Sequence, residues 1–176
     1  VGFDLYVRLV GEAVAEFRGE GEAEPVEIRI ELPVDAHLPH DYVPGERLRL
    51  EMYRKLAAVP DEAGLAEIEA ELRDRYGEPP EAVRNLVEVA RLRTVARAAG
   101  IADVTLQGAV VRFGPAQLRE SQQLRLLRLY PGSLVKEPLR TILVPVPKTA
   151  RVGGVLLRDT AVLRWASDLL RAVVLG

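Results

Sequence analysis

Three acidic side chains, Glu67, Glu71 and Asp74, have the types and spacing that most suggest a function. Their i, i+4, i+7 spacing places them along one side of a predicted helix, next to its apolar face. Like charges four residues apart repel by a few tenths of a kcal/mol, and Asp74 lies in the last turn, where the helix dipole disfavours an anion. Arg73 and Arg75 could neutralise these charges. The alternative is an acidic docking edge for a basic partner.

A metal site is the chemistry that the segment DAHLPHD would suggest, because it holds His37 and His40 between Asp35 and Asp41. The spacing fits neither a helical i, i+4 pair nor a zinc knuckle, and Pro39 stiffens the loop. The segment therefore favours a loop that packs against the domain and caps the next helix.

Catalytic motifs are absent from the sequence. It contains no GxxxxGK[ST] phosphate-binding loop, and Gly19, Glu20 and Gly21 form too short and too acidic a segment to replace one. The sequence has no cysteine, and none of its serines lies in a nucleophile elbow (Ser121, Ser133 and Ser167). A small hydrolase is a third possible class, but the sequence offers no nucleophile–base pair for one. No catalytic, cofactor-binding or metal-binding residue is therefore predicted.

Nucleic-acid binding remains an alternative because four arginines fall on one predicted helix: Arg84, Arg91, Arg93 and Arg97. They spread around the helix, and no aromatic side chain alternates with them for base stacking. The net charge of −2 provides no long-range attraction to a polyanion. A solvated helix face is the simpler interpretation, and a stand-alone nucleic-acid-binding module is the alternative.

The acidic trio belongs to a predicted three-helix unit. The first helix covers residues 46–59, the second extends to about Tyr76 after an N-cap at Asp61, and the third covers about 80–99. Gly77 is placed to end the second helix, and the prolines that follow prevent its continuation. The core of the unit is expected to contain Leu48, Met52, Leu56, Ile68 and Leu72.

The remaining elements indicate a small sheet. Residues 26–32 alternate as a half-buried strand, and residues 104–113 form a hairpin around Gln107 and Gly108. Residues 114–129 predict a weaker helix, and residues 139–146 an extended segment that Pro145 and Pro147 would place at a sheet edge. The last helix carries a clear apolar stripe: Val162, Trp165, Ala166, Leu169, Leu170 and Val173. The predicted class is α+β, with a small sheet or hairpin packed against five to six helices in one domain.

The bounds of the chain suggest a piece of a larger protein. It has 176 residues, an apolar fraction of 48%, and no apolar run of the roughly 18 residues that span a bilayer. It begins with Val1, and its one methionine is Met52. A helical apolar pattern starts at Phe3, so residues 1–24 are expected to be a lead-in helix and acidic linker, and residues 25–176 the domain proper.

Several motifs together resemble the C-terminal domain of bacterial transcription-repair coupling factor. They are AHLPHDYVP at 36–44, Arg47 and Leu48, YRKLA at 53–57, ELRDRYGEPP at 71–80, and ARLR at 90–93 followed by Gly100 and Ile101. The opening residues 1–14 resemble the helix by which the motor region of that family leads into this domain. The resemblance covers about residues 1–113.

The resemblance implies a regulatory role inside an ATP-driven translocase on double-stranded DNA. That family displaces stalled RNA polymerase and recruits UvrA for nucleotide excision repair in the bacterial cytoplasm. ATP and magnesium belong to the motor of the parent protein, whose motifs this chain lacks. The domain would dock on the N-terminal UvrB-like region and mask its UvrA-binding surface. The acidic interface pair of the family falls on Glu71 and Asp74, with Glu67 beside them.

Overall fold

The computed structural model describes residues 27–176 and contains a five-stranded mixed sheet in the order β1-β2-β3-β5-β4. Strand β1 runs parallel to β2, and the remaining neighbours are antiparallel. The strands are β1 (Arg29–Glu31), β2 (Asp103–Gln107), β3 (Val110–Gly114), β4 (Leu134–Lys136) and β5 (Thr141–Pro145).

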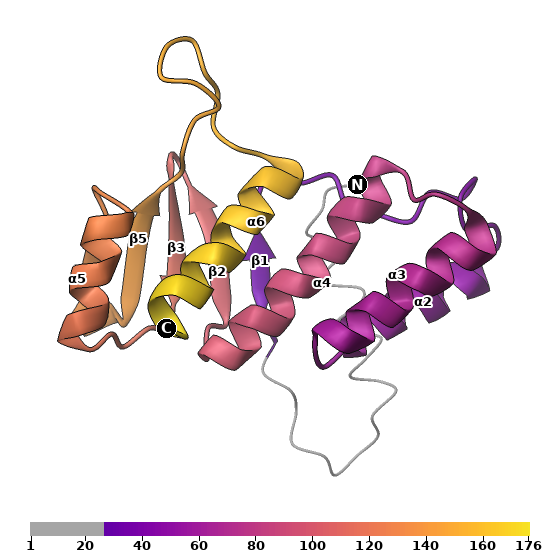
Figure 1. The fold of residues 1–176 in the computed structure, drawn as a ribbon, viewed down its shortest axis with the longest axis horizontal. Coiled ribbons are helices and arrows are strands. Elements are labelled where there is room, and N and C mark those ends of the chain that lie inside the picture. The colour runs from indigo at the N-terminus through magenta and orange to yellow at the C-terminus, as the bar shows by residue number, and fades with distance from the viewer. Residues whose placement is uncertain (1–26) are drawn as a thin grey trace.

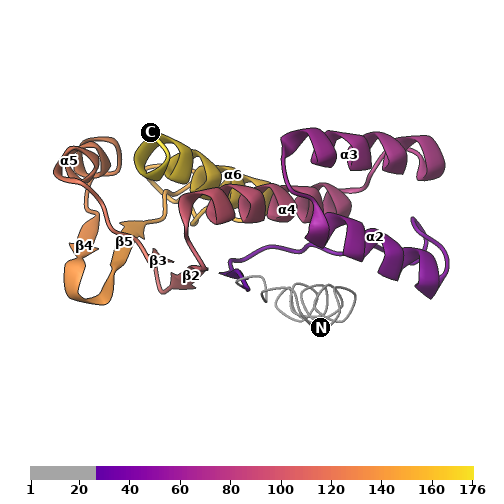
Figure 2. The same cartoon turned by 90° about the horizontal axis from the view of Figure 1, so that it is seen from below.

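Five α-helices accompany the sheet in the described part of the chain, so the predicted α+β class is confirmed. Helices α4 and α6 lie side by side, and α4, α5 and α6 lie on the same side of the sheet (Figures 1 and 2). Helices α2 and α3 pack beside α4 at the end of the molecule away from α5 (Figure 1). The bounds are α2 (Glu46–Ala58), α3 (Glu62–Tyr76), α4 (Glu81–Ala99), α5 (Glu120–Leu129), η1 (Glu137–Leu139), α6 (Asp159–Leu169) and the π-helical turn η2 (Leu170–Val174).

The core lies between the sheet and the helices that cover it. A row of directly paired apolar residues crosses four strands, and all of its members are buried: Ile30, Val104, Phe113 and Ile142. Alternation along each strand brings these side chains to one face, as a period of two requires. The ring centroid of Phe113 lies 6.1 Å from that of Trp165 on α6. This contact links the sheet to the last helix.

The predicted three-helix unit is confirmed, with helix ends within one residue of those expected. Met52, Leu56, Ile68 and Leu72 are buried, and Leu48 is partly buried against them. The hydroxyl of Tyr42 lies 3.2 Å from the Leu72 carbonyl oxygen and 2.8 Å from that of Gly77, so the loop before α2 holds the end of α3. The AHLPHDYVP motif therefore includes a structural tyrosine.

Two expectations from the sequence are wrong in detail. The segment around residues 139–146 is not at a sheet edge, because β5 pairs with β3 on one side and with β4 on the other. Pro145 is the last residue of β5 and therefore interrupts no interior ladder. Helix α5 begins at Glu120 rather than at Gly114. The backbone of the intervening loop is hydrogen-bonded to another segment instead of within a helix, because the Ala116 N–H donates to the Arg140 carbonyl at 2.7 Å. The predicted lead-in helix and linker lie outside the described residues.

Replacing the helix cap Asp61 with alanine is expected to destabilise the domain by about 1 kcal/mol. The Asp61 carboxylate accepts a hydrogen bond from the Gly64 N–H at 2.8 Å, which satisfies a donor in the first turn of α3. Urea unfolding measures the change. Asp61→Asn is the matched control, since asparagine caps as well as aspartate, and an equal loss in both variants would contradict a capping role.

Candidate functional site

The acidic trio of α3 divides into one engaged and two open carboxylates. Glu71 is partly buried, and its two carboxylate oxygens lie 2.8 and 3.0 Å from Lys55 Nζ on α2. Arg75 Nη1 lies 3.0 Å from the same carboxylate. Glu67 and Asp74 are exposed, and within residues 27–176 neither makes an ion pair. The open part of the predicted edge is therefore Glu67 and Asp74.

The environment of Glu71 lowers its pKa below the usual range. The hydrogen bond from Lys55 is the largest cause, partial burial opposes it, and the hydrogen bond from Arg75 adds to the lowering. The carboxylate is thus held ionised and fixed in position between α2 and α3. Of the two arginines expected to neutralise the trio, Arg75 does so at Glu71, whereas Arg73 pairs with Glu78 at 3.6 Å.

Replacing Lys55 with methionine is expected to raise the pKa of Glu71, because it removes the largest cause of the lowering. A carboxylate with a lowered folded pKa stabilises the fold above its unfolded pKa, and that contribution is lost as the pH falls through the folded pKa. NMR titration of the Glu71 carboxyl carbon measures the shift. Lys148→Met, in an exposed loop, is the control and should leave the titration unchanged. An unchanged Glu71 midpoint in Lys55→Met would contradict this assignment.

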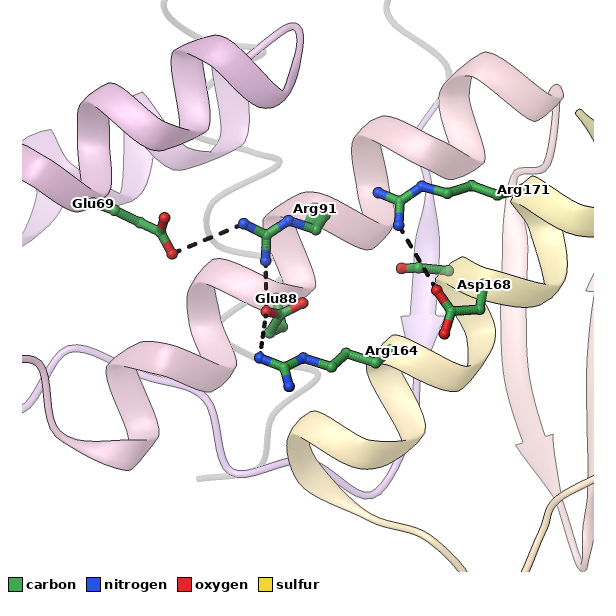
Figure 3. Close-up of a pocket in the computed structure, with 7 residues that line it drawn as sticks. Glu69, Glu88, Arg91, Arg164, Asp168 and Arg171 are labelled. Carbon is green, nitrogen blue, oxygen red and sulfur yellow. Dashed lines mark hydrogen bonds and ion pairs between the residues drawn. The ribbon is translucent and has the colours of Figure 1, made fainter.

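The opposite side of α3 meets a charge network centred on Arg91 of α4. The Arg91 guanidinium donates to both carboxylate oxygens of Glu62 at 2.9 and 3.0 Å and to Glu88 at 2.5 Å. Glu69 lies 3.9 Å away, and Arg164 of α6 reaches Glu88 at 3.5 Å (Figure 3). The network therefore joins α3, α4 and α6.

Burial makes this network a structural feature of the domain. The side chains of Glu88 and Arg91 are 9% and 16% exposed. Burial acts against the charge of Arg91, but hydrogen bonds to Glu62 and Glu88 outweigh it and raise the pKa of Arg91. The hydrogen bond from Arg91 likewise lowers the pKa of Glu62.

The four arginines of α4 do not form one solvated face, which corrects the sequence interpretation. Arg91 lies in the network, and Arg84 donates to the Pro79 carbonyl at 2.7 Å. Burial, with neighbouring Arg97, lowers the pKa of Arg93 to about 10. Arg84 and Arg97 are exposed, as expected.

A cavity of about 410 Å³ opens beside this network, between α3, α4 and α6 (Figure 3). A second cavity of about 360 Å³ adjoins it near the start of α6. Arginine and acidic side chains dominate the lining of the first cavity, which comprises Glu69, Glu88, Arg91, Arg164, Ser167, Asp168 and Arg171. Sequence reasoning missed this cluster, although the i, i+3 spacing of Glu88 and Arg91 was a signal for an ion pair.

The DAHLPHD loop packs against the domain, as predicted, and its contacts are with α4. His37 Nδ1 lies 2.9 Å from the Asp35 carboxylate, and the His37 N–H donates to the Ala82 carbonyl at 3.3 Å. Asn85 of α4 is buried and donates to the Asp35 carbonyl at 2.9 Å. The loop does not cap α2, whose N-cap residue Gly45 makes no side-chain hydrogen bond. Within residues 27–176, no three histidine or acidic side chains gather in a group that could hold a metal ion.

Among the helices of residues 27–176, none combines the length and the apolar character that crossing a bilayer requires.

The fold and the candidate edge define an α+β domain whose distinctive side chains form charged contacts between helices. The chain belongs to the TRCF domain family, whose sequence profile matches residues 32–124. This confirms the resemblance to the C-terminal domain of transcription-repair coupling factor.

The relatives and a solved structure agree with this assignment. The chain is 45% identical over 185 residues to transcription-repair-coupling factors of Mycobacterium bovis and Mycobacterium tuberculosis, an alignment that covers 98% of this chain and 15% of each relative. A relative from Staphylococcus haemolyticus is 42% identical over 103 residues, or 57% of this chain. A crystal structure of a C-terminal domain of transcription-repair coupling factor has a TM-score of 0.67 at 18% identity, covering 84% of this chain and 91% of that one. The chain thus spans about 15% of the length of these two mycobacterial relatives.

Proposed function

We propose that this domain restrains a transcription-repair coupling factor by docking on its N-terminal UvrB-like region and covering the surface that binds UvrA. The parent protein would be an ATP- and magnesium-dependent translocase on double-stranded DNA that acts on stalled RNA polymerase in the bacterial cytoplasm. In this proposal residues 25–176 form the regulatory domain, and residues 1–24 lead into it from the motor.

The observation that carries the proposal is the open pair of carboxylates on α3. Glu67 and Asp74 are exposed and lack an ion pair within residues 27–176, while Glu71 is fixed beside them by Lys55. Basic side chains of the N-terminal region would pair with this edge. Glu71 would contribute a carboxylate that Lys55 and Arg75 already hold in position, so docking would not have to immobilise this side chain.

Weak contacts suit such a role. An exposed ion pair contributes about 0.2–1 kcal/mol, which is too little to hold two separate molecules. Within one chain, tethering supplies an effective concentration on the order of millimolar, so a few such pairs suffice. A domain that must release its partner benefits from this weakness, because a very tight contact would need an implausibly large differential affinity to open.

Deleting the domain from the full-length protein tests the proposal. The truncated protein is expected to bind UvrA more tightly and to hydrolyse ATP faster in the absence of polymerase. UvrA binding and ATPase rates equal to those of the intact protein would refute it. A gel shift with the 176-residue chain addresses the nucleic-acid alternative, for which tight binding that weakens steeply with salt is the signature.

A further inference from the structure

The cavity between α3, α4 and α6 contains hydrogen-bond donors that the described residues do not use. Ser167 is 2% exposed, and its hydroxyl has no hydrogen-bond partner there. A buried polar group without a partner destabilises a fold, so it calls for an explanation. Ser167 is one of the residues that line the cavity, so an acceptor bound there would lie next to this side chain.

Two arginines accompany this hydroxyl on the same side of α6 and its π-helical end. Arg164, Ser167 and Arg171 are spaced three and four residues apart, which places them on one helix face. Figure 3 shows Arg164 and Arg171 projecting from the last helix toward the side of α4 that carries Glu88 and Arg91. The two arginine side chains therefore extend from one helix into the same cavity.

Both arginines keep most of their hydrogen-bonding capacity. Arg164 makes one contact, at 3.5 Å to Glu88, and its side chain is 67% exposed. Arg171 makes one contact, at 3.9 Å to Asp168, and is 46% exposed. A guanidinium carries five N–H donors in a planar fork that matches a carboxylate. Arg91, by contrast, already donates to Glu62 and Glu88.

We propose that this cavity binds one carboxylate, supplied by an acidic side chain of a partner polypeptide. The carboxylate would accept hydrogen bonds from Arg164 and Arg171 and from the Ser167 hydroxyl. Glu69, Glu88 and Asp168 also line the cavity, so it accommodates a single negative charge better than a phosphate dianion or a nucleic-acid backbone. This site goes beyond the docking edge on α3, because it uses donors of α6 and an anionic partner.

NMR titration of the arginine Nε–Hε signals of the 176-residue chain tests the proposal. The probe is a capped alanine pentapeptide with one central glutamate, and the same peptide with glutamine is its control. We expect saturable shifts of the Arg164 and Arg171 signals with the glutamate peptide alone, with a dissociation constant on the order of millimolar. No saturable shift, an equal response to the glutamine peptide, or tighter binding of inorganic phosphate would overturn it.

Variants separate binding from folding. Arg171→Gln is expected to weaken binding at least about fivefold, since it removes a charge-assisted donor. Arg151→Gln, at an exposed turn, is the matched control and should leave binding unchanged. Ser167→Ala is expected to weaken binding without lowering the melting temperature, because its hydroxyl has no partner to lose among the described residues. Unaltered binding in both Arg171→Gln and Ser167→Ala would refute the site.

Discussion

A full-length transcription-repair coupling factor carrying Glu71→Lys and Asp74→Lys is expected to hydrolyse ATP faster without polymerase and to bind UvrA more tightly. Each substitution reverses the charge of the side chain and so replaces an attraction to a basic partner with a repulsion. Two contacts changed in this way amount to roughly 1–3 kcal/mol, which shifts the docked-to-open ratio by about 5- to 150-fold. Basal ATPase rate and the UvrA dissociation constant are the two measurements.

The structure refines the choice of variants for this prediction. Glu71→Lys would place a third cation beside Lys55 and Arg75, so it also perturbs the packing of α2 against α3. Glu67→Lys with Asp74→Lys alters open carboxylates and avoids this effect. Glu120→Lys is the matched control, since it is an exposed acid on α5, at the far end of the molecule from α3 (Figure 1). If both double variants match the wild type in ATPase and UvrA binding, the docking assignment fails.

Replacing Arg91 with alanine is expected to lower the free energy of unfolding of the domain by about 3 kcal/mol. The change leaves the buried Glu88 carboxylate with one long contact to Arg164 and removes the link from α4 to Glu62. An uncompensated buried charge is much more costly than a lost surface ion pair. Urea unfolding of the 176-residue chain measures the difference.

Two further variants identify the cause of this loss. Arg97→Ala removes an exposed arginine of the same helix and should change the stability by no more than about 0.5 kcal/mol. The double variant Glu88→Gln with Arg91→Met should recover part of the loss, because it removes the buried negative charge together with its partner. A loss below 1 kcal/mol in Arg91→Ala would show that the network contributes little.

Local signals predicted the three-helix unit well. Asp61 caps α3 and Gly77 follows its end at φ +85°, as the sequence indicated, because caps and helix ends depend on residues that are neighbours along the chain. The sheet was harder to predict. β4 comprises only Leu134–Lys136, too few residues for an alternating pattern, so its pairing with β5 and the interior position of β5 went unpredicted.

The candidate edge was located from sequence, but its charge balance was not. Helical spacing placed Glu67, Glu71 and Asp74 on one side. Arg73 and Arg75 were expected to neutralise these charges, but Arg75 pairs with Glu71 whereas Arg73 pairs with Glu78. Lys55, the principal partner of Glu71, lies on another helix and becomes a neighbour only through the packing of α2 on α3. The same reason explains why the network around Arg91 was missed, since it draws on three helices.

Photo-crosslinking from position 74 of the full-length protein tests the docking of the α3 edge most directly. Asp74 is replaced with p-benzoyl-phenylalanine, the resting protein is irradiated, and the crosslinked peptides are identified by mass spectrometry. If the α3 edge docks as proposed, crosslinks to the N-terminal UvrB-like region are expected that disappear when polymerase is engaged, and none are expected from the same residue at position 120. Crosslinks from position 74 that never reach the N-terminal region would contradict it.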